Sequence, residues 1–405
     1  MVALKPHPHL RVRDLGLWAS RARSGGTAVL SPHQIVFTYS GRGALFQLAS
    51  QLPNRHRDTV LLPAFHCPTV VDPILEAGYQ PRFYAVSENL LVDVEDFTAK
   101  LDKSVAAAVV INYMGFPSNL EALRRACQDV DAVVIEDCAH SFLQANPLEL
   151  AGARGDAAIF SFKKLVPTLV GGGIRINNGS LSVRPPNKRA PARDTLVNCK
   201  RLLEEAVNSL ESGNVVRSMF NHLEAFRLGA KRGKEKQSEL SQSDERRLTF
   251  DYPFDARLAT VRMPWYARKI LERAALDEVA TVRRQNFRFL SENLKKRSGF
   301  VSVFERLPDR VCPWAFPVIV PNRSRVDIEL RKRGVALFTF GETLHPILAK
   351  CARNDRGMIE RAKFLSSSLL CLSIHQGLTT KDLMDECGII NEFVDVNAAA
   401  AASSP

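Results

Sequence analysis

Apolar and polar residues alternate in blocks along the first half of the chain. Short apolar runs with little polar alternation predict buried strands, at Asp58–Phe65, Gln80–Val86, Ala106–Gly115 and Asp131–Ala139. Segments of helical period separate them, at Gly43–Leu52, Pro68–Tyr79, Asp93–Leu101 and Asn119–Val130. Buried strands that alternate with helices predict an α/β fold, in which a large, mostly parallel sheet is sandwiched by helices.

The second half of the chain is more polar and more helical. We expect a large domain over residues 1–250, with a helical, charged excursion at about 185–250. A smaller α+β C-terminal domain should cover 251–395, where a long helical pattern at Ala267–Leu294 precedes short strands and helices. The low-complexity residues 396–405 should form a disordered tail.

Composition and charge narrow the class of protein. The 405 residues carry a formal charge of +12, which could indicate a nucleic-acid or membrane partner or equally anionic small molecules. The basic residues are dispersed and form no aromatic-basic module, so a plain nucleic-acid-binding protein is not expected. No apolar run is long enough to span a membrane, and the N-terminus has no apolar signal segment. The eight cysteines form no CxxC pair, which predicts reduced thiols, a cytoplasmic protein and no metal site.

Candidate chemistry lies where the predicted strands end, because ligands of parallel α/β sheets bind at the carboxyl ends of the strands. At the first such place, Gly41 and Gly43 precede a helix whose free backbone N–H groups would suit a phosphate. At the second, His66 lies between a strand and a helix. This histidine could cover a ring-shaped ligand, or it could equally be a surface residue of a loop.

The third place is the end of the strand that leads into Glu136 and Asp137. A carboxylate there is costly to bury unless it has a partner, and a protonated ring nitrogen would be one. His140, which follows closely, could hydrogen-bond an oxygen of the same ring. Asp137 could instead cap a helix. We favour the ligand interpretation, because Asp137 and His140 together suit one ligand.

The fourth place is Ala158–Ile176, where an apolar run ends at Ser161 and two lysines, a proline and three glycines follow. Lys163 and Lys164 could be charges on a solvated loop, or one of them could be a nucleophile that forms an imine with an aldehyde. Ser161 could donate a hydrogen bond to a phosphate. A phosphate, a ring nitrogen, a phenolic oxygen and an aldehyde together describe pyridoxal phosphate, which needs a lysine and an acidic partner.

Several segments occur in a familiar order along the chain. SGRGAL at 40–45 is followed by VVIEDCAHSF at 133–142, GDAAIFSFKK at 155–164 and LCLSIHQGLTTKDL at 370–383. This order resembles that of the DegT/DnrJ/EryC1/StrS family, whose members are pyridoxal-phosphate enzymes that mostly aminate keto-sugar nucleotides. The first segment is similar to the family's phosphate-binding SGTxAL. The resemblance covers most of the chain and is strongest in its first half.

The resemblance implies a fold-type-I pyridoxal-phosphate transferase and a role for each matching residue. Asp137 would pair with the pyridine nitrogen, and His140 would contact the side of the phenolic oxygen. Ser161 would hold the phosphate together with the backbone at Gly41 and Arg42.

The resemblance also suggests which lysine reacts. Lys164 would form the imine and, after its release, would be the general base of the proton shift. We prefer it to Lys163 because family members with a short turn place the lysine three residues after the serine, in register with the proline and glycines that follow. The family position that stacks on the cofactor ring aligns with Cys67, so His66 or Phe65 would stack instead.

By the same resemblance the activity would be the transfer of an amino group, from glutamate, to a keto-sugar that is nucleotide-linked, in amino-sugar, polysaccharide or secondary-metabolite biosynthesis. The enzyme would be a homodimer in which Arg262 reaches the neighbouring subunit's site. Two alternatives stay open. Lys164 argues against a dehydratase, because relatives that dehydrate sugars carry a histidine there. Arg42 and Val170 depart from the family pattern and leave open a catalytically idle homologue with a regulatory or assembly role.

Two further histidines, His345 and His375, are candidates for the mouth of the site. Local hydrogen bonding within their loops is the better interpretation of each.

Overall fold

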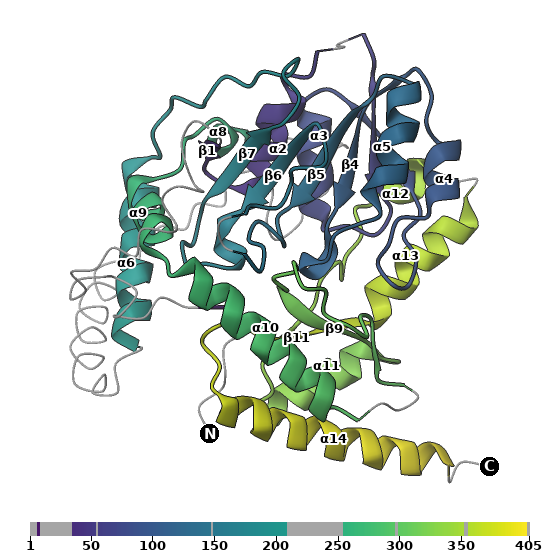
Figure 1. Ribbon diagram of the computed structural model, residues 1–405, viewed down its shortest axis with the longest axis vertical. Helices are drawn as coiled ribbons and strands as arrows, with labels where there is room; N and C mark the ends of the chain where they lie inside the picture. Colours follow the sequence, from purple (N-terminus) through teal and green to yellow (C-terminus); the bar gives the residue numbers. More distant parts are fainter. Residues whose placement is uncertain are drawn as a thin grey trace, which may run out of the picture.

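The computed structural model describes residues 6–8, 35–53, 56–146, 149–208, 254–295, 299–351 and 355–402, with side chains up to residue 396. Within these residues, the larger sheet has seven strands in the order β1-β7-β6-β5-β4-β2-β3 (Figure 1). The strands are β1 Val36–Thr38, β2 Thr59–Pro63, β3 Gln80–Tyr84, β4 Val105–Ile111, β5 Val133–Cys138, β6 Ala157–Ser161 and β7 Gly172–Ile176. β2 to β6 pair in parallel, whereas β7 is antiparallel to both β6 and β1. The predicted α/β fold with a mostly parallel sheet is confirmed.

Helices flank this sheet. α2 (Gly41–Ala49) packs against β6 and β7 and against α3 (Val71–Glu76), while α5 (Leu120–Asp129) packs against β5 and against α4 (Val94–Ala99). Because the helices exclude water, every residue of β2, β4, β5 and β6 is buried, which is why these strands read as continuous apolar runs. The apolar face predicted for α5 is buried through Leu120, Leu123 and Cys127.

A second sheet of the described residues has four antiparallel strands in the order β10-β11-β9-β8 and lies below the larger sheet in Figure 1. The strands are β8 Val301–Ser302, β9 Ala315–Ile319, β10 Leu337–Phe338 and β11 Leu369–Ser373. The helices near it are α10 Leu276–Asn293, α11 Arg323–Lys332, α13 Arg356–Ser368 and α14 Thr380–Ala402. The proposed boundary between two domains near residue 250 stays a prediction.

The remaining helices connect these parts. They are α6 Ala192–Asn208, α8 Ala256–Ala259, α9 Trp265–Arg273 and α12 Ile347–Cys351, with the short 3-10 turns η2 Pro68–Val70, η3 Tyr113–Gly115 and η4 Phe162–Lys164. α6 lies within the helical excursion predicted at 185–250, whose residues from 209 onward lie outside the described part of the chain. None of the described helices combines the length and the apolar composition needed to cross a bilayer.

Two expectations about the second half differ from the structure. The single long helical pattern is divided into α9 and α10 at Ala274, whose backbone is extended at φ −62° and ψ 133°. The expected disordered tail from residue 396 is wrong for most of its length, because α14 continues to Ala402. A run of alanines has the highest intrinsic helix propensity, so it can extend a helix that is already formed.

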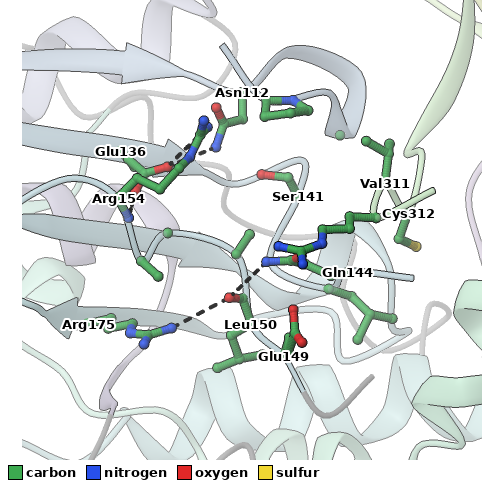
Figure 2. Close-up of a pocket in the computed structure, with 17 residues that line it drawn as sticks. Asn112, Glu136, Ser141, Gln144, Glu149, Leu150, Arg154, Arg175, Val311 and Cys312 are labelled. Carbon is green, nitrogen blue, oxygen red and sulfur yellow. Dashed lines mark hydrogen bonds and ion pairs between the residues drawn. The ribbon is translucent and has the colours of Figure 1, made fainter. Parts of the chain in front are cut away.

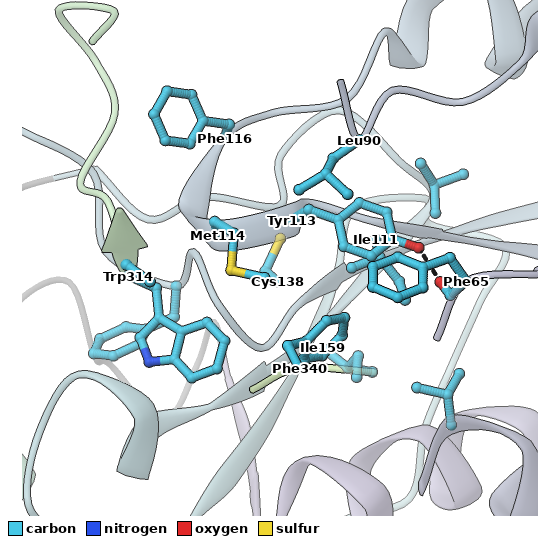
Figure 3. Close-up of a cluster of buried hydrophobic side chains, with 14 of the residues drawn as sticks. Phe65, Leu90, Ile111, Tyr113, Met114, Phe116, Cys138, Ile159, Trp314 and Phe340 are labelled. Carbon is cyan, nitrogen blue, oxygen red and sulfur yellow. Dashed lines mark hydrogen bonds between the residues drawn. The ribbon is translucent and has the colours of Figure 1, made fainter. Parts of the chain in front are cut away.

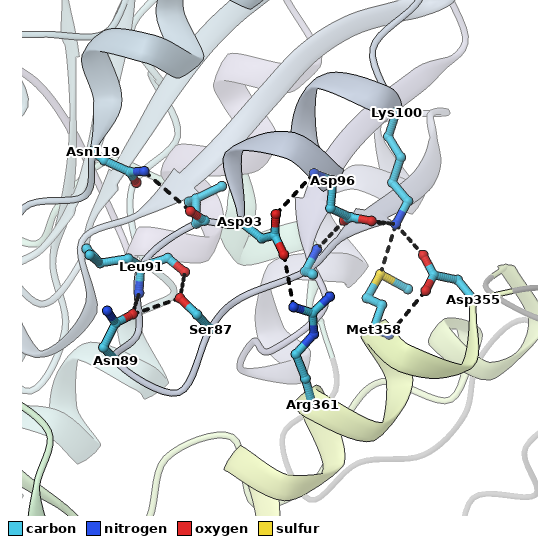
Figure 4. A network of polar contacts seen from close by, with 12 residues as sticks. Ser87, Asn89, Leu91, Asp93, Asp96, Lys100, Asn119, Asp355, Met358 and Arg361 are labelled. Carbon is cyan, nitrogen blue, oxygen red and sulfur yellow. Dashed lines mark hydrogen bonds and ion pairs between the residues drawn. The ribbon is translucent and has the colours of Figure 1, made fainter.

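A network of polar contacts joins the two parts of the molecule (Figure 4). Lys100, at the end of α4, contacts both carboxylate oxygens of Asp96 at 2.8 and 2.9 Å and reaches Asp355 beside α13 at 2.5 Å. Arg361 of α13 pairs with Asp93 at 2.9 Å. These contacts hold α13, and with it the smaller sheet, against the edge of the larger sheet.

Candidate active site

The N-terminus of α2 forms a small cup next to the end of β6. The Oγ of Ser40 accepts a hydrogen bond from Gly43 N at 3.1 Å and so caps the helix. A Cβ added to Gly41 would lie 3.1 Å from the Cβ and 3.6 Å from the Oγ of Ser161, so this position brings the helix backbone close to the serine hydroxyl. A helix N-terminus with an adjacent hydroxyl is a site for an anion such as phosphate.

Gly172 of β7 makes this approach possible. It pairs with Thr38 of β1 on one side and with Ser161 of β6 on the other. A Cβ at this residue would lie 2.3 Å from the carbonyl carbon of Ser40, which no real side chain tolerates. Only glycine therefore lets β7 pass directly behind the start of α2.

Asp137 lies at the end of β5 with 4% of its surface exposed. Its Oδ1 accepts a hydrogen bond from Ala139 N at 2.8 Å, and its carboxylate makes no other hydrogen bond within the described part of the chain. Desolvation raises the pKa of this carboxyl to about 6, although the Ala139 hydrogen bond and the charge of Lys164 oppose the shift. The carboxylate is therefore available for a cationic partner.

Lys164 ends the turn η4 that follows β6, and its Nζ lies 4.1 Å from the centroid of the Trp314 ring. Desolvation lowers the pKa of this lysine, while Cys67, Asp137 and Cys371 act in the opposite direction. The half-buried Lys164 thus lies near Asp137, and its amine loses its proton more readily than that of an exposed lysine.

Lys163 is more exposed than Lys164. Desolvation, followed by the charges of Lys164 and Arg42, lowers the pKa of Lys163 to about 8. Of the two lysines, only Lys164 contacts the buried aromatic wall described next.

His140 packs flat on Trp314, with ring centroids 4.0 Å apart and an interplanar angle of 26°. The edge of Phe340 contacts its ring, and Figure 3 shows Trp314 and Phe340 in one cluster with Tyr113 and Phe65. Burial, followed by the charge of Lys164, holds the pKa of His140 well below its usual value, so the imidazole is neutral. Its Nδ1 accepts from Met114 N at 3.4 Å, which assigns the ring proton to Nε2.

His66 is not part of this group. Its ring is fully buried, and Nδ1 donates to Pro63 O at 2.9 Å while Nε2 accepts from His345 N at 3.4 Å. It also stacks on Phe83 with ring centroids 5.4 Å apart. Protein groups thus hold both ring nitrogens of His66, and its expected place over a ligand ring stays a prediction.

The other candidate residues also have clear positions. His375 bonds locally, since its Nδ1 accepts from Gly377 N at 3.0 Å. The Nδ1 of His345 likewise accepts from Ile347 N at 3.2 Å, but its Nε2 lies 3.3 Å from Oδ1 of the distant Asp72 in α3. The backbone of Arg262 forms an isolated antiparallel β-bridge with Thr38 of β1, the strand that leads to the cup. Its expected reach to a neighbouring subunit stays a prediction.

The structure brings Gly41, Asp137, His140, Ser161 and Lys164 to one edge of the larger sheet. Trp314 is the residue of this site that sequence reasoning missed. It lies just before β9 in the second half of the chain, and its segment CPWAFPVIVP indicated only a strand. No local signal could have linked it to His140 and Lys164.

Comparisons with known proteins show a similarity between the first half of the chain and one family. Residues 29–184 match the model of the DegT/DnrJ/EryC1/StrS aminotransferase family. GDP-perosamine synthase of Vibrio cholerae is 30% identical over 147 residues, which is 36% of this chain and 40% of that protein. The dTDP-4-dehydro-2,3,6-trideoxy-D-glucose 4-aminotransferase of Saccharopolyspora spinosa is 27% identical over 145 residues, or 36% and 38% of the two chains. The matched part thus spans about two fifths of these relatives.

Solved structures extend the likeness of fold to nearly the whole chain. Helicobacter pylori PseC, an aminotransferase involved in the biosynthesis of pseudoaminic acid, superposes with a TM-score of 0.61 at 13% identity and covers 89% of this chain and 87% of its own. Residues 29–184 are thus similar to the DegT/DnrJ/EryC1/StrS aminotransferase family, and the solved structure shows that the chain shares its fold with such an enzyme.

Proposed function

We propose that this protein is a pyridoxal-phosphate-dependent aminotransferase that moves an amino group from glutamate to a keto-sugar, most fittingly a nucleotide-linked one. One observation carries the proposal: Lys164 lies near the buried carboxylate of Asp137, next to the cup at Gly41 and Ser161. The sugar nucleotides in the names of the two relatives support the acceptor class. A homodimer in the cytoplasm remains our expectation for the assembled enzyme.

The residues present fit pyridoxal phosphate. The cup offers backbone N–H groups and the Ser161 hydroxyl to a phosphate, with room that a side chain at Gly41 would fill. Asp137 is a buried carboxylate whose raised pKa signals a missing cationic partner, which a protonated pyridine nitrogen would supply. When bound, the cofactor supplies a carbonyl group and an electron-accepting ring.

The chain's own side chains then have distinct tasks. Asp137 would keep a proton on the ring nitrogen by its charge. His140, neutral and protonated at Nε2, would have that nitrogen free to donate a hydrogen bond to the cofactor. Lys164 would hold the carbonyl group through Nζ, and its free amine would accept and return the proton that moves during transfer, for which its lowered pKa is suited. Trp314 and Phe340 form an apolar wall that excludes water from these groups.

Lys164 also supports amino transfer over the two alternatives. A dehydratase of this family is expected to carry a histidine at this position, and an idle homologue has no need to keep Lys164 and Asp137 together. Both features favour amino transfer.

The test is to load the purified protein with pyridoxal phosphate, reduce it with borohydride and locate the bound label by mass spectrometry. We expect the label on Lys164 in the wild type and none in Lys164→Ala, while Lys163→Ala keeps it. The loaded wild type should also convert glutamate to 2-oxoglutarate in an amount equal to the bound cofactor. A label on Lys163 would refute the lysine assignment, and a protein that binds no cofactor would support the idle homologue.

A further inference from the structure

A cavity of about 760 Å³ lies beside Glu136 of β5 (Figure 2). Cross-strand partners share a face of a sheet, and the register pairs Glu136 with Ala158 and Ala158 with Arg175. Glu136 and Arg175 line the cavity. Asp137 follows Glu136 on the strand and therefore points to the other face. The sheet separates the cavity from the group that includes Lys164.

Two segments far apart in sequence wall this cavity. One is the connection between β5 and β6, whose Gln144 donates from Nε2 to Leu150 O at 3.2 Å. The other precedes β9 and is joined to the first where Ala145 N donates to Arg310 O at 3.0 Å and where Gln144 bridges to Val311. These contacts join the two walls of the cavity.

The lining carries three arginines against two glutamates. Arg154, Arg175 and Arg310 come from the β5–β6 connection, from β7 and from the segment before β9. The buried Glu136 is already stabilised, because its Oε1 accepts from Arg154 N at 2.7 Å and from Gly155 N at 2.6 Å. The lining of the cavity therefore offers more positive than negative charge to a ligand.

The arginines have donors to spare. Arg154 is partly engaged, because its Nη2 donates to Ser118 O at 3.4 Å and lies 4.0 Å from Oε2 of Glu136. Arg175 makes one long bond, from Nη1 to Leu150 O at 3.5 Å, and the Arg310 side chain makes no hydrogen bond or ion pair within the described part of the chain. A guanidinium has five N–H donors. The buried Oγ of Ser141 also lines the cavity without a nitrogen or oxygen partner among the described residues, and only the weakly bonding thiol of Cys138 lies beside it.

We propose that this cavity is a binding site for a small molecule that bears a phosphoryl group, separate from the Lys164 site. Guanidinium groups recognise phosphate oxygens in a bidentate manner, and Arg175 and Arg310 together offer more donors than a single carboxylate would need. Leu143, Leu150 and Val311 supply apolar surface for the rest of the ligand. The volume lies within the range of small-molecule sites. This inference does not depend on the proposed amino transfer.

The position of the cavity links it to the other face. Ser141 directly follows His140, and Cys312, which also lines the cavity, lies close before Trp314. An occupant would therefore touch both segments that carry the stacked His140–Trp314 pair.

The test is isothermal titration calorimetry on the full chain, loaded with pyridoxal phosphate and freed of excess by gel filtration, so that the phosphate cup is filled. The probes are inorganic pyrophosphate, ADP and, as a carboxylate comparison, succinate. We expect one site per chain for the two phosphoryl probes, weaker binding of succinate, and an affinity that falls with salt. Tighter binding of ADP than of pyrophosphate would identify a nucleotide as the source of the phosphoryl group; equal binding would identify a simple phosphate ester.

Variants locate the binding. Arg310→Gln and Arg175→Gln should each weaken pyrophosphate binding about tenfold or more, because each removes a charge-assisted hydrogen bond. Arg325→Gln, which removes an exposed arginine of α11 that does not line the cavity, should leave the affinity unchanged. An unchanged affinity in the first two variants, or a loss caused only by Lys163→Gln, would place the anion in the Lys164 site and overturn the inference. The absence of binding at about 10 mM probe would also overturn the inference, because it means that the free energy of binding is weaker than about 3 kcal/mol.

Discussion

Gly172→Ala tests whether the close approach of β7 to α2 builds the phosphate cup. Gly172 does not adopt a positive φ, so alanine fits its backbone and the only change is the added methyl group. That methyl would lie 2.3 Å from the carbonyl carbon, 2.4 Å from the oxygen of Ser40 and 2.6 Å from Gly41 N. These atoms belong to the backbone and cannot rotate away.

The magnitude follows from these distances. Carbon atoms in contact lie about 3.5–4.0 Å apart, so the start of α2 must move away from β7 by about 1 Å. Overpacking costs about 1–3 kcal/mol and more where the backbone must shift, so we expect the loss of stability to reach about 3 kcal/mol. Displacing Gly41 from Ser161 should also remove at least one hydrogen bond to the phosphate, which weakens cofactor binding by about tenfold or more.

The assay is urea denaturation of the cofactor-free protein together with absorbance titration with pyridoxal phosphate. Gly357→Ala is the matched control, because its added methyl would meet no atom within 4 Å and the residue lies in α13. This control should keep the cofactor affinity and gain up to about 1 kcal/mol of stability. Wild-type stability in Gly172→Ala would refute the tight approach. A destabilised Gly172→Ala with unchanged cofactor affinity would refute the phosphate cup.

Three further predictions concern charges elsewhere in the fold. Because burial raises the pKa of Asp137 to about 6, the folded cofactor-free protein holds that proton more tightly than the unfolded chain. Ionisation of this group should lower stability by roughly 2 kcal/mol as pH rises from 4 to 7, and Asp137→Asn should remove this contribution from the pH dependence measured by urea denaturation at several pH values. Lys100→Ala leaves Asp96 and Asp355 without their cation and should destabilise the protein by about 1–3 kcal/mol in thermal denaturation. The control Lys103→Ala removes an exposed lysine and should change stability by less than about 0.5 kcal/mol, so equal effects of the two variants would contradict the network. Burial raises the pKa of Glu386 to about 8, and its Oε2 has no partner among the described residues. Glu386→Gln keeps an acceptor for Ala336 N and should be more stable than wild type by at least about 1 kcal/mol at pH 8.5 but not at pH 4. A gain in stability that does not depend on pH would contradict the ionisation of Glu386.

Local pattern was enough to predict the larger sheet. A strand buried on both faces has no polar alternation, and a helix that covers it repeats its apolar residues every three or four positions, so each element leaves its own signature. Asp137 and Ser161 could be expected near one another for the same reason, since parallel strands end at one edge of a sheet. These predictions required only the order of elements and the rule for parallel sheets.

Contacts between distant parts of the chain decided the rest. The sequence indicated that His66 lies on a loop, but only the packed structure turns its ring into the core against Phe83 and His345. Nothing in the alanines at 274 and 275 interrupts a helix, so packing alone divides α9 from α10.

The amino-acid sequence by itself determined which residues could carry the chemistry and which elements hold them, because propensity, periodicity and strand order are local properties. Only the tertiary structure decided that Trp314, from the second half of the chain, lies under Lys164 and against His140. It also placed three arginines from separate segments around one cavity behind the sheet. Burial and electrostatic surroundings arise from such long-range packing, and they in turn set the proton affinities on which the site depends.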